Sequence, residues 1–305
     1  MPPKKLPIKI DGRKLTLSNV DKVLYPQSGF TKGQMIEYYR RIAPVLIPHL
    51  KNRPLTLKRF PNGVREEFFY EKRCPSFRPD WILTRQVGES SRAEPPNYCV
   101  VNDAAALIWV ANLASIELHT MLFTIEKINV PTFMVFDLDP GAPADIINCA
   151  EIAIHMRDML QNLKLQSFPK TSGGKGLHFY VPLNTPASFD QTKTFSRAVA
   201  RTMEQAFPDR VVSKMSKSLR PGKVFIDWSQ NDSHKTTVVA YSLRARERPT
   251  VSTPLTWKEL ERAYDKKDAG LLHFEWDDVL RRVEKTGDLF AEVLTLKQSL
   301  PAIKI

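Results

Sequence analysis

The apolar and polar positions follow two periods in the first part of the chain. Behind Thr31, residues 31–49 place apolar side chains at helical spacing, which predicts a helix capped by that threonine. Residues 55–60 alternate and residues 68–70 are aromatic, so two short strands are predicted. Residues 102–121 are rich in alanine and leucine, and we expect a single buried helix there.

The same two periods alternate through the rest of the chain. An apolar run at 130–140 predicts a strand, and it is followed by a helix at 144–163, a strand at 177–181 and a helix at 188–207. We also expect strands at 224–228 and 237–242, amphipathic helices near 256–264 and 276–285, and polar loops at 87–98 and 211–223. Alternating strands and helices predict a βαβ-type sheet covered by helices. Without repeats or an obvious linker, the chain is expected to form one module with two lobes.

Charge and cysteine content narrow the classes of partner and compartment. The 45 Lys and Arg against 33 Asp and Glu leave a net charge of +12 and a pI of about 9.6. This excess favours a polyanionic partner, with nucleic acid ahead of an anionic membrane surface, although solubility alone would also account for it. No apolar run reaches about 18 residues, so no membrane span is expected, and the first residues lead us to expect no secretory signal. The three scattered cysteines are expected to be reduced thiols in a cytosolic protein.

An acidic pair ends the apolar run at 130–140. Asp137 and Asp139 are two residues apart, so on a strand they face the same side. Two neighbouring carboxylates repel unless a cation lies between them, and hard divalent cations prefer such oxygen ligands. The pair could instead end a strand and cap a turn, and metal-dependent glycosyltransferases also use Asp-x-Asp. Asp227 is a third acid in an apolar strand, where either a salt bridge or a two-metal site would compensate its burial.

A glycine-rich basic segment, Ser172–His178, lies between the acids in sequence. Its glycines, including Gly174, allow backbone N–H groups to face an anion, and Lys175 adds a positive charge. The segment lacks the spacing of a P-loop and could be a simple turn with a solvated lysine. A run of basic residues leads into the Asp227 strand and is either a phosphate-facing surface or a solvated face; it comprises Lys214, Lys217, Arg220 and Lys223.

Basic and aromatic residues also occur together near the predicted strands at 55–60 and 68–70. Lys58 and Arg59 could contact a nucleic-acid backbone while Phe68 and Phe69 stack on a base. Core packing is the competing interpretation for the two phenylalanines.

These motifs, in this order, resemble the archaeo-eukaryotic primase superfamily, and within it the polymerase domain of the bacterial DNA ligase D group. The resemblance covers nearly the whole chain. It is carried by Leu17–Pro26, Arg59–Gly63, Glu117–His119, Asp137–Asp139, Ser172–His178, Lys217–Lys223, Val224–Asn231 and Tyr241–Arg244. It implies an α/β (mixed α+β) fold with two lobes, the second containing an RRM-like sheet. We therefore expect residues 1–305 to be one catalytic module, with an N-terminal lobe at about 1–130 and a catalytic lobe at about 131–305.

The resemblance also implies a role for each matching residue. Asp137, Asp139 and Asp227 would bind two divalent ions, Mn²⁺ or Mg²⁺, with Arg220 assisting catalysis from a mobile loop. Nucleotide binding would fall to Ser172, Gly174, Lys175, His178, His119, Gln230 and Arg244. A DNA 5′-phosphate would be bound by Asn19, Lys22 and Lys32. The template would be contacted by Lys58, Arg59, Phe68 and Phe69, and the loop at 87–98 would help to pair broken ends.

The function implied is that of a template-dependent nucleotidyltransferase in non-homologous end joining. It would extend 3′ ends and fill gaps that carry a 5′-phosphate, using NTPs or dNTPs and preferring ribonucleotides. Ku and a DNA ligase would be partners, a membrane would not, and the protein would be cytoplasmic and nucleoid-associated in a prokaryote. We expect a stand-alone polymerase or an excised domain. The alternatives are a non-catalytic DNA-end binding module and an Asp-x-Asp glycosyltransferase.

Overall fold

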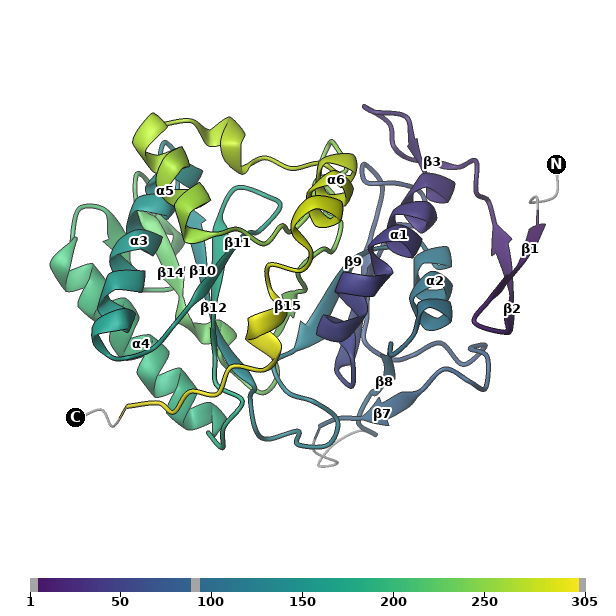
Figure 1. Ribbon diagram of the computed structural model, residues 1–305, viewed down its shortest axis with the longest axis horizontal. Helices are drawn as coiled ribbons and strands as arrows, with labels where there is room; N and C mark the ends of the chain where they lie inside the picture. The colour runs from purple at the N-terminus through teal and green to yellow at the C-terminus, as the bar shows by residue number, and fades with distance from the viewer. Residues whose placement is uncertain (1–4, 89–93, 302–305) are drawn as a thin grey trace. The chain divides into compact units, whose positions relative to one another are not determined.

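Helices and strands alternate through residues 5–88 and 94–301, the parts of the chain described by a computed structural model (Figure 1). The chain forms two units. The first comprises Met1–Met121, Val238–Ser252 and Phe274–Asp288, and the second comprises Leu122–Thr237, Thr253–His273 and Leu289–Ile305. The segments at 238–252 and 274–288 therefore belong to the first unit, whereas the sequence analysis assigned everything after about residue 131 to the second lobe. The amino-acid composition does not change at the points where the chain passes from one unit to the other.

The second unit is built around a βαββαβ succession. Its elements are β10 (Phe133–Pro140), α3 (Ile146–Asn162), β11 (Phe168–Thr171), β12 (Leu177–Pro182), α4 (Phe189–Ala206) and β14 (Val224–Asp227). The strands lie in the order β11-β12-β10-β14-β13, with the short β13 at Val211–Val212. This order confirms the mixed α/β, RRM-like sheet.

The strands of this sheet run mainly antiparallel to their neighbours. Pairing is antiparallel between β11 and β12, β12 and β10, and β10 and β14, and only β13 and β14 are parallel. The reason is that β11 and β12 are joined by the short glycine-rich turn, so they form a hairpin rather than a helical crossover. Helices α3 and α4 pack against β10, and α5 (Trp257–Lys266) packs against α3 (Figure 1).

The described residues of the first unit form a second sheet and the helices α1, α2 and α6. Its central strands are β5 (Pro54–Arg59) and β9 (Ser115–Met121), with β6 (Phe69–Glu71), β7 (Thr84–Gln86) and β8 (Asn97–Val100) alongside. Helix α1 (Lys32–Leu50) packs against α2 (Ala104–Asn112) and α6 (Trp276–Thr286). Smaller elements are β1 (Lys5–Ile10), β2 (Arg13–Ser18), β3 (Val23–Tyr25), β4 (Phe30–Thr31) and β15 (Thr236–Val238), where the chain re-enters this unit.

The predicted helix start at Thr31 is confirmed. Its side chain accepts a hydrogen bond from the Gln34 backbone N–H at 3.2 Å, and the Gln34 side chain accepts one from the Thr31 N–H at 2.8 Å. This reciprocal capping box satisfies donors that a helix start would otherwise leave open.

The single helix expected at 102–121 is wrong. Helix α2 ends at Asn112, Ala114 adopts a left-handed φ of 58°, and the chain continues as β9. Ile116 and Leu118 are fully buried in the sheet. Alanine and leucine suit both structures, so composition concealed a helix followed by a strand.

The expectation of three reduced thiols is also wrong. Cys74 and Cys99 form a disulfide, with their Cα atoms 4.9 Å apart, and Cys149 is a buried free thiol in α3. The two bonded cysteines are 25 residues apart in sequence, so only the packing of the segment before β7 against β8 brings them together.

The loop predicted at 87–98 is confirmed only in part, since β7 ends at Gln86 and β8 already begins at Asn97. Residues 89–93 lie outside the described residues. Among the helices that the structure describes, none combines the length and the apolar character needed to cross a bilayer.

Candidate functional site

The three predicted carboxylates share one face of the second unit's sheet. Asp137 and Asp139 alternate along β10, and Asp137 lies directly opposite Asp227 in the antiparallel pair with β14. Directly opposed residues in such a pair project to the same side. The sheet therefore gathers all three acids on one side, while Phe136 and Leu138, which alternate with the acids along β10, are fully buried.

Neutral donors surround the Asp227 carboxylate. One oxygen accepts hydrogen bonds from the Ser229 backbone N–H at 2.9 Å and the Ser229 hydroxyl at 2.6 Å. The other accepts from the Gln230 side-chain amide at 3.2 Å. These contacts orient Asp227 without the lysine or arginine that the salt-bridge interpretation required, and they tie Gln230 to the acid face.

The donor set is suited to a hard divalent cation. Three carboxylates on one sheet face supply the oxygen ligands that Mg²⁺ and Mn²⁺ prefer. Within residues 5–88 and 94–301, no three His, Cys, Asp or Glu side chains already converge as a metal-holding group. The fit to a divalent cation therefore rests on two facts: the ligands are carboxylates, and they share one face of the sheet.

The glycine-rich segment folds around the Ser172 side chain and lies against the acid strand. The Ser172 hydroxyl accepts hydrogen bonds from the N–H groups of Gly174 at 3.1 Å and Gly176 at 3.3 Å. These two amides therefore point at Ser172, whereas the sequence pattern predicted that such N–H groups would face an anion. A Cβ on Gly176 would lie 2.1 Å from the Leu138 carbonyl oxygen, so only glycine allows this approach.

A pocket opens beside this segment within the second unit. It encloses about 380 Å³ and is lined by Gly174, Lys175, Pro140, Asp145 and His273, among others. On the sheet itself, His178 Nε2 lies 3.1 Å from Asp137 Oδ1. The segment therefore presents a lysine to a cavity and a histidine to the acid face.

The basic loop is docked to the turn that follows the acid pair. Gly141 donates to the Lys223 carbonyl at 2.8 Å and accepts from the Gly222 N–H at 2.9 Å. A Cβ on Gly141 would lie 2.0 Å from the Arg220 carbonyl oxygen. The Arg220 guanidinium lies 3.7 Å from the centroid of Phe225, whose register partner is Asp139. Arg220 is thus packed beside the acid strand, whereas Lys214 and Lys217 are exposed.

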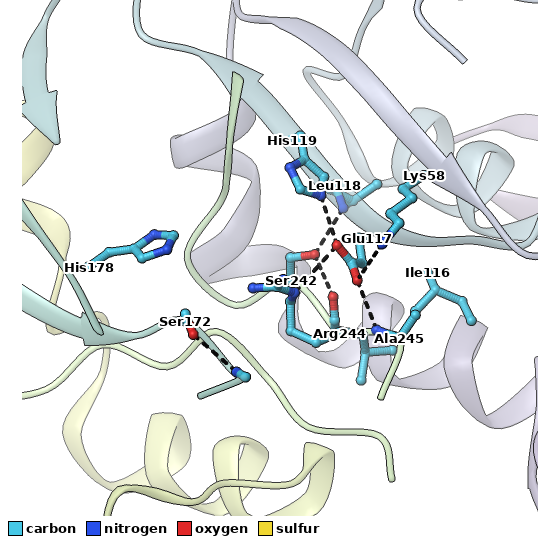
Figure 2. A network of polar contacts seen from close by, with 12 residues as sticks. Lys58, Ile116, Glu117, Leu118, His119, Ser172, His178, Ser242, Arg244 and Ala245 are labelled. Carbon is cyan, nitrogen blue, oxygen red and sulfur yellow. Dashed lines mark hydrogen bonds and ion pairs between the residues drawn. The ribbon is translucent and has the colours of Figure 1, made fainter. Parts of the chain in front are cut away.

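A buried glutamate organises polar side chains in the first unit (Figure 2). Glu117 on β9 lies 2.9 Å from His119 Nε2, 3.4 Å from Lys58 Nζ and 3.4 Å from Arg244 Nε. It also accepts a hydrogen bond from the Ala245 N–H at 3.1 Å. The predicted residues His119, Arg244 and Lys58 are therefore brought together around one carboxylate.

Protonation in this cluster follows from burial and charge. Burial alone would raise the pKa of Glu117, but the His119 hydrogen bond and the charges of Arg244 and Lys58 hold this pKa well below 4.5. Burial lowers the pKa of His119 below 6.5 despite its contact with Glu117. Glu117 is therefore ionised at neutral pH and His119 is neutral, with its Nε2–H directed at Glu117.

The aromatic residues beside this cluster are exposed, which contradicts core packing. Phe68 and Phe69 keep 49% and 44% of their surface accessible. Lys58 Nζ lies 4.4 Å from the Phe68 ring centroid, and the Arg59 guanidinium carbon lies 5.1 Å from that of Phe69. Paired cations and exposed rings are typical of a surface that stacks bases and contacts phosphates.

The predicted 5′-phosphate residues lie on adjoining turns. The Lys22 N–H donates to the Asn19 carbonyl at 3.1 Å, and the Lys32 N–H donates to the Lys22 carbonyl at 2.8 Å. The Lys32 ammonium donates to the Ser18 carbonyl at 2.6 Å. Burial, together with the positive charges of Arg59 and Lys22, lowers the pKa of Lys32 to about 8.

Sequence reasoning missed three residues of these clusters. In the sequence, Glu117 stands out only as part of the Glu117–His119 motif, although its charge organises the first unit's cluster. Gly141 is required by the close approach of the basic loop, and no local sequence pattern indicates that contact. Lys170 is fully buried on β11 with its Nζ 3.2 Å from His178 Nδ1. A lone lysine in the apolar segment 168–171 was the available signal, since buried charges need partners.

Known proteins are similar to this chain in sequence and in fold. Residues 31–290 match the family described as LigD, primase-polymerase domain. A Mycolicibacterium smegmatis protein described as multifunctional non-homologous end joining protein LigD is 44% identical over 280 residues, covering 91% of this chain and 36% of that protein. A bifunctional non-homologous end joining protein LigD of Bacillus subtilis is 30% identical over 289 residues, covering 94% of this chain and 45% of that protein.

A solved structure agrees with both the sequence match and the fold. It is the polymerase domain from Mycobacterium tuberculosis ligase D in complex with DNA, at 40% identity and a TM-score of 0.85. The match covers 93% of this chain and 99% of that one. The chain spans less than half the length of these two relatives, so the match covers one part of them. The chain belongs to the LigD primase-polymerase domain family.

Proposed function

We propose that this chain is a template-dependent nucleotidyltransferase that extends 3′ ends at DNA breaks in non-homologous end joining. The observation that carries the proposal is the register of β10 and β14, which sets Asp227 opposite Asp137 and beside Asp139 on one sheet face. Membership of the primase-polymerase family supports the same reaction. The DNA-bound relative supports DNA as the partner.

The acid face is proposed to hold two divalent ions, Mg²⁺ or Mn²⁺, through Asp137, Asp139 and Asp227. When bound, such ions acidify the attacking hydroxyl and offset the charge that develops during phosphoryl transfer. Ser229 and Gln230 keep the Asp227 carboxylate oriented by hydrogen bonds. Arg220, packed beside the acid strand, is proposed to assist engagement of the primer.

Within the second unit, nucleotide phosphates are assigned to the glycine-rich segment and its neighbours. Lys175 lines the adjacent pocket and supplies positive charge. His178 contacts the acid face, and Ser172 and Gly174 fix the shape of the segment. Gln230 supports the same face through Asp227. A nucleoside triphosphate is the ligand that fits these groups.

The first unit is proposed to contact DNA and to recognise a ribose hydroxyl. Lys58 and Arg59 would contact the template backbone while Phe68 and Phe69 stack on bases. Neutral His119 donates through Nε2 to Glu117, which leaves Nδ1 as the ring's acceptor for a hydroxyl proton. Arg244 would bind phosphate, and the paired turns of Asn19, Lys22 and Lys32 would bind a 5′-phosphate. Ku and a DNA ligase are the proposed protein partners.

Primer extension on a gapped duplex tests this function. We expect the wild type to extend a labelled primer with Mn²⁺ and ribonucleotides, and Asp227→Asn to lose about a hundredfold or more in rate. Triphosphate binding by that variant should change little, because Asp227 is assigned to the primer side of the reaction. Asp190→Asn, an acid in the first turn of α4, is the matched control.

The same assay separates the alternative of a DNA-end binding module. Retention of the gapped duplex by the wild type without extension would support the module and contradict the polymerase. Normal extension by Asp227→Asn would remove this acid from the mechanism.

A further inference from the structure

A row of polar side chains crosses the second unit's sheet from an edge strand to the acid face. Lys170 on β11 lies opposite His178 on β12, and His178 lies opposite Asp137 on β10. Opposed residues of antiparallel strands share a face, so all three side chains project to the same side. Lys170 has no exposed surface at all.

The imidazole of His178 contacts both of its neighbours in this row. Lys170 Nζ lies 3.2 Å from His178 Nδ1, and His178 Nε2 lies 3.1 Å from Asp137 Oδ1. A lysine ammonium can only donate hydrogen bonds, and an ionised carboxylate can only accept them. With Lys170 as an ammonium and Asp137 as a carboxylate, His178 accepts at Nδ1 and donates at Nε2, which selects the neutral tautomer with its proton on Nε2.

We propose that Lys170 is a positioning residue that fixes this tautomer of His178 and aims its Nε2–H at the acid face. The significance for catalysis rests on the proposed function, in which His178 contacts the nucleotide phosphates. A fixed Nε2–H is a donor for carboxylate or phosphate oxygens. The opposite tautomer would present a lone pair to those anions and repel them.

The Lys170 contact also restrains the orientation of the imidazole. A rotation about χ2 would exchange the ring's nitrogen and carbon positions. Such a rotation breaks the Lys170 contact at Nδ1 as well as the Asp137 contact at Nε2, so both neighbours oppose it and the loss of Lys170 weakens that restraint. The 5.6 Å approach of Lys170 Nζ to the Tyr180 ring centroid further confines the ammonium. The role assigned to the lysine is therefore one that acts on the reaction through the histidine.

Nitrogen NMR of histidine-labelled protein tests the tautomer directly, without nucleotide or metal. The His178 signals are identified by their loss in His178→Gln. In the wild type, we expect a pyridine-like Nδ1 and a pyrrole-like Nε2. Lys170→Met should shift both signals toward averaged values, whereas Lys170→Arg, which keeps a donor, should preserve the wild-type pattern. Lys193→Met, a lysine paired with Asp232 on another part of the unit, should leave both signals unchanged.

Steady-state kinetics then tests the consequence for nucleotide binding. Lys170→Met should raise KM for the triphosphate about tenfold, with a smaller change in kcat, as expected for a lost hydrogen bond to a charged group. In the His178→Gln background, the same substitution should add no further increase. Unchanged His178 signals in a folded Lys170→Met protein would overturn the proposal. If Lys170→Met does not fold, Lys170→Leu, which likewise carries no donor, takes its place, and wild-type-like signals there would overturn the proposal equally.

The positioning role of Lys170 and the proposed polymerase function can be refuted independently. A wild type that lacks polymerase activity but shows the Lys170-dependent tautomer would refute the proposed function and keep the positioning role. Active polymerase with a Lys170-independent tautomer would refute the positioning role alone.

Discussion

Gly176 and the Leu138 carbonyl oxygen approach so closely that a Cβ at position 176 would lie only 2.1 Å from that oxygen. Leu138 stands between Asp137 and Asp139, so this contact seats the glycine-rich segment directly on the acid strand. The packing of backbone against backbone makes the glycine necessary, since neither partner can turn aside as a flexible side chain would.

Gly176→Ala should therefore disturb both stability and nucleotide binding. We expect a loss of about 1–3 kcal/mol in the free energy of unfolding, because the added methyl must displace the acid strand or the segment. Chemical denaturation and triphosphate titration measure the two effects. Gly12→Ala is the control, since a Cβ there meets nothing within 4 Å, although its φ of +80° carries strain of its own. Equal triphosphate affinity for Gly176→Ala and wild type would contradict the assigned contact.

Lys22→Ala should selectively weaken binding to gaps that carry a 5′-phosphate. The Lys22 ammonium donates to Asn62 at 2.7 Å and adjoins the Asn19 turn, and we assign its charge to the phosphate dianion. Fluorescence anisotropy with phosphorylated and unphosphorylated gaps measures the ratio of affinities. Lys14→Ala, an exposed lysine on β2, should not change that ratio. An equal loss on both gaps would show that Lys22 makes only a general electrostatic contribution.

The preference for a 5′-phosphate should decline as pH rises through about 8. Lys32, with its pKa lowered to about 8, loses its positive charge there, whereas the phosphate is already a dianion. Affinity ratios measured from pH 7 to pH 9.5 should show the decline in the wild type and not in Lys32→Arg. A wild-type affinity ratio that does not change with pH would contradict the role of Lys32 in phosphate binding.

The same lysine has a defined effect on stability. Its pKa of about 8 in the folded protein lies below the ordinary 10.5, so between these values the unfolded chain binds more protons. The free energy of unfolding contributed by Lys32 therefore rises with pH across that window, and the cost of burying its charge is present in full below pH 8. The slope should be reduced in Lys32→Met.

Glu117→Gln should destabilise the first unit by about 3 kcal/mol at neutral pH, since it removes the carboxylate from buried cationic partners. The pKa of Glu117 is depressed in the folded state, so its contribution is present in full above pH 4.5 and is lost as pH falls further. Denaturation curves should show the difference between variant and wild type narrowing below that pH. Glu284→Gln, at an exposed pair with Arg41, should cost less than about 1 kcal/mol. A constant difference across pH 3–7 would contradict the role of the Glu117 charge.

Much of the local structure was predictable because its causes are local. The capping box at Thr31, the helices α3 and α4, and the strand that bears Asp137 follow from capping chemistry and periodicity. The single helix predicted at 102–121 was wrong because alanine and leucine suit either a helix or a buried strand. The Cys74–Cys99 disulfide was missed because sequence spacing does not reveal which distant cysteines meet.

The sequence by itself determined the type of each functional group and its immediate geometry. Asp137 and Asp139 had to share a face because side chains on a strand alternate. Only the tertiary structure decided that Asp227 joins them, that Lys170 reaches His178, and that Glu117 gathers His119 and Arg244. Strand order and register arise from packing between segments far apart in the chain, and no local pattern encodes that pairing.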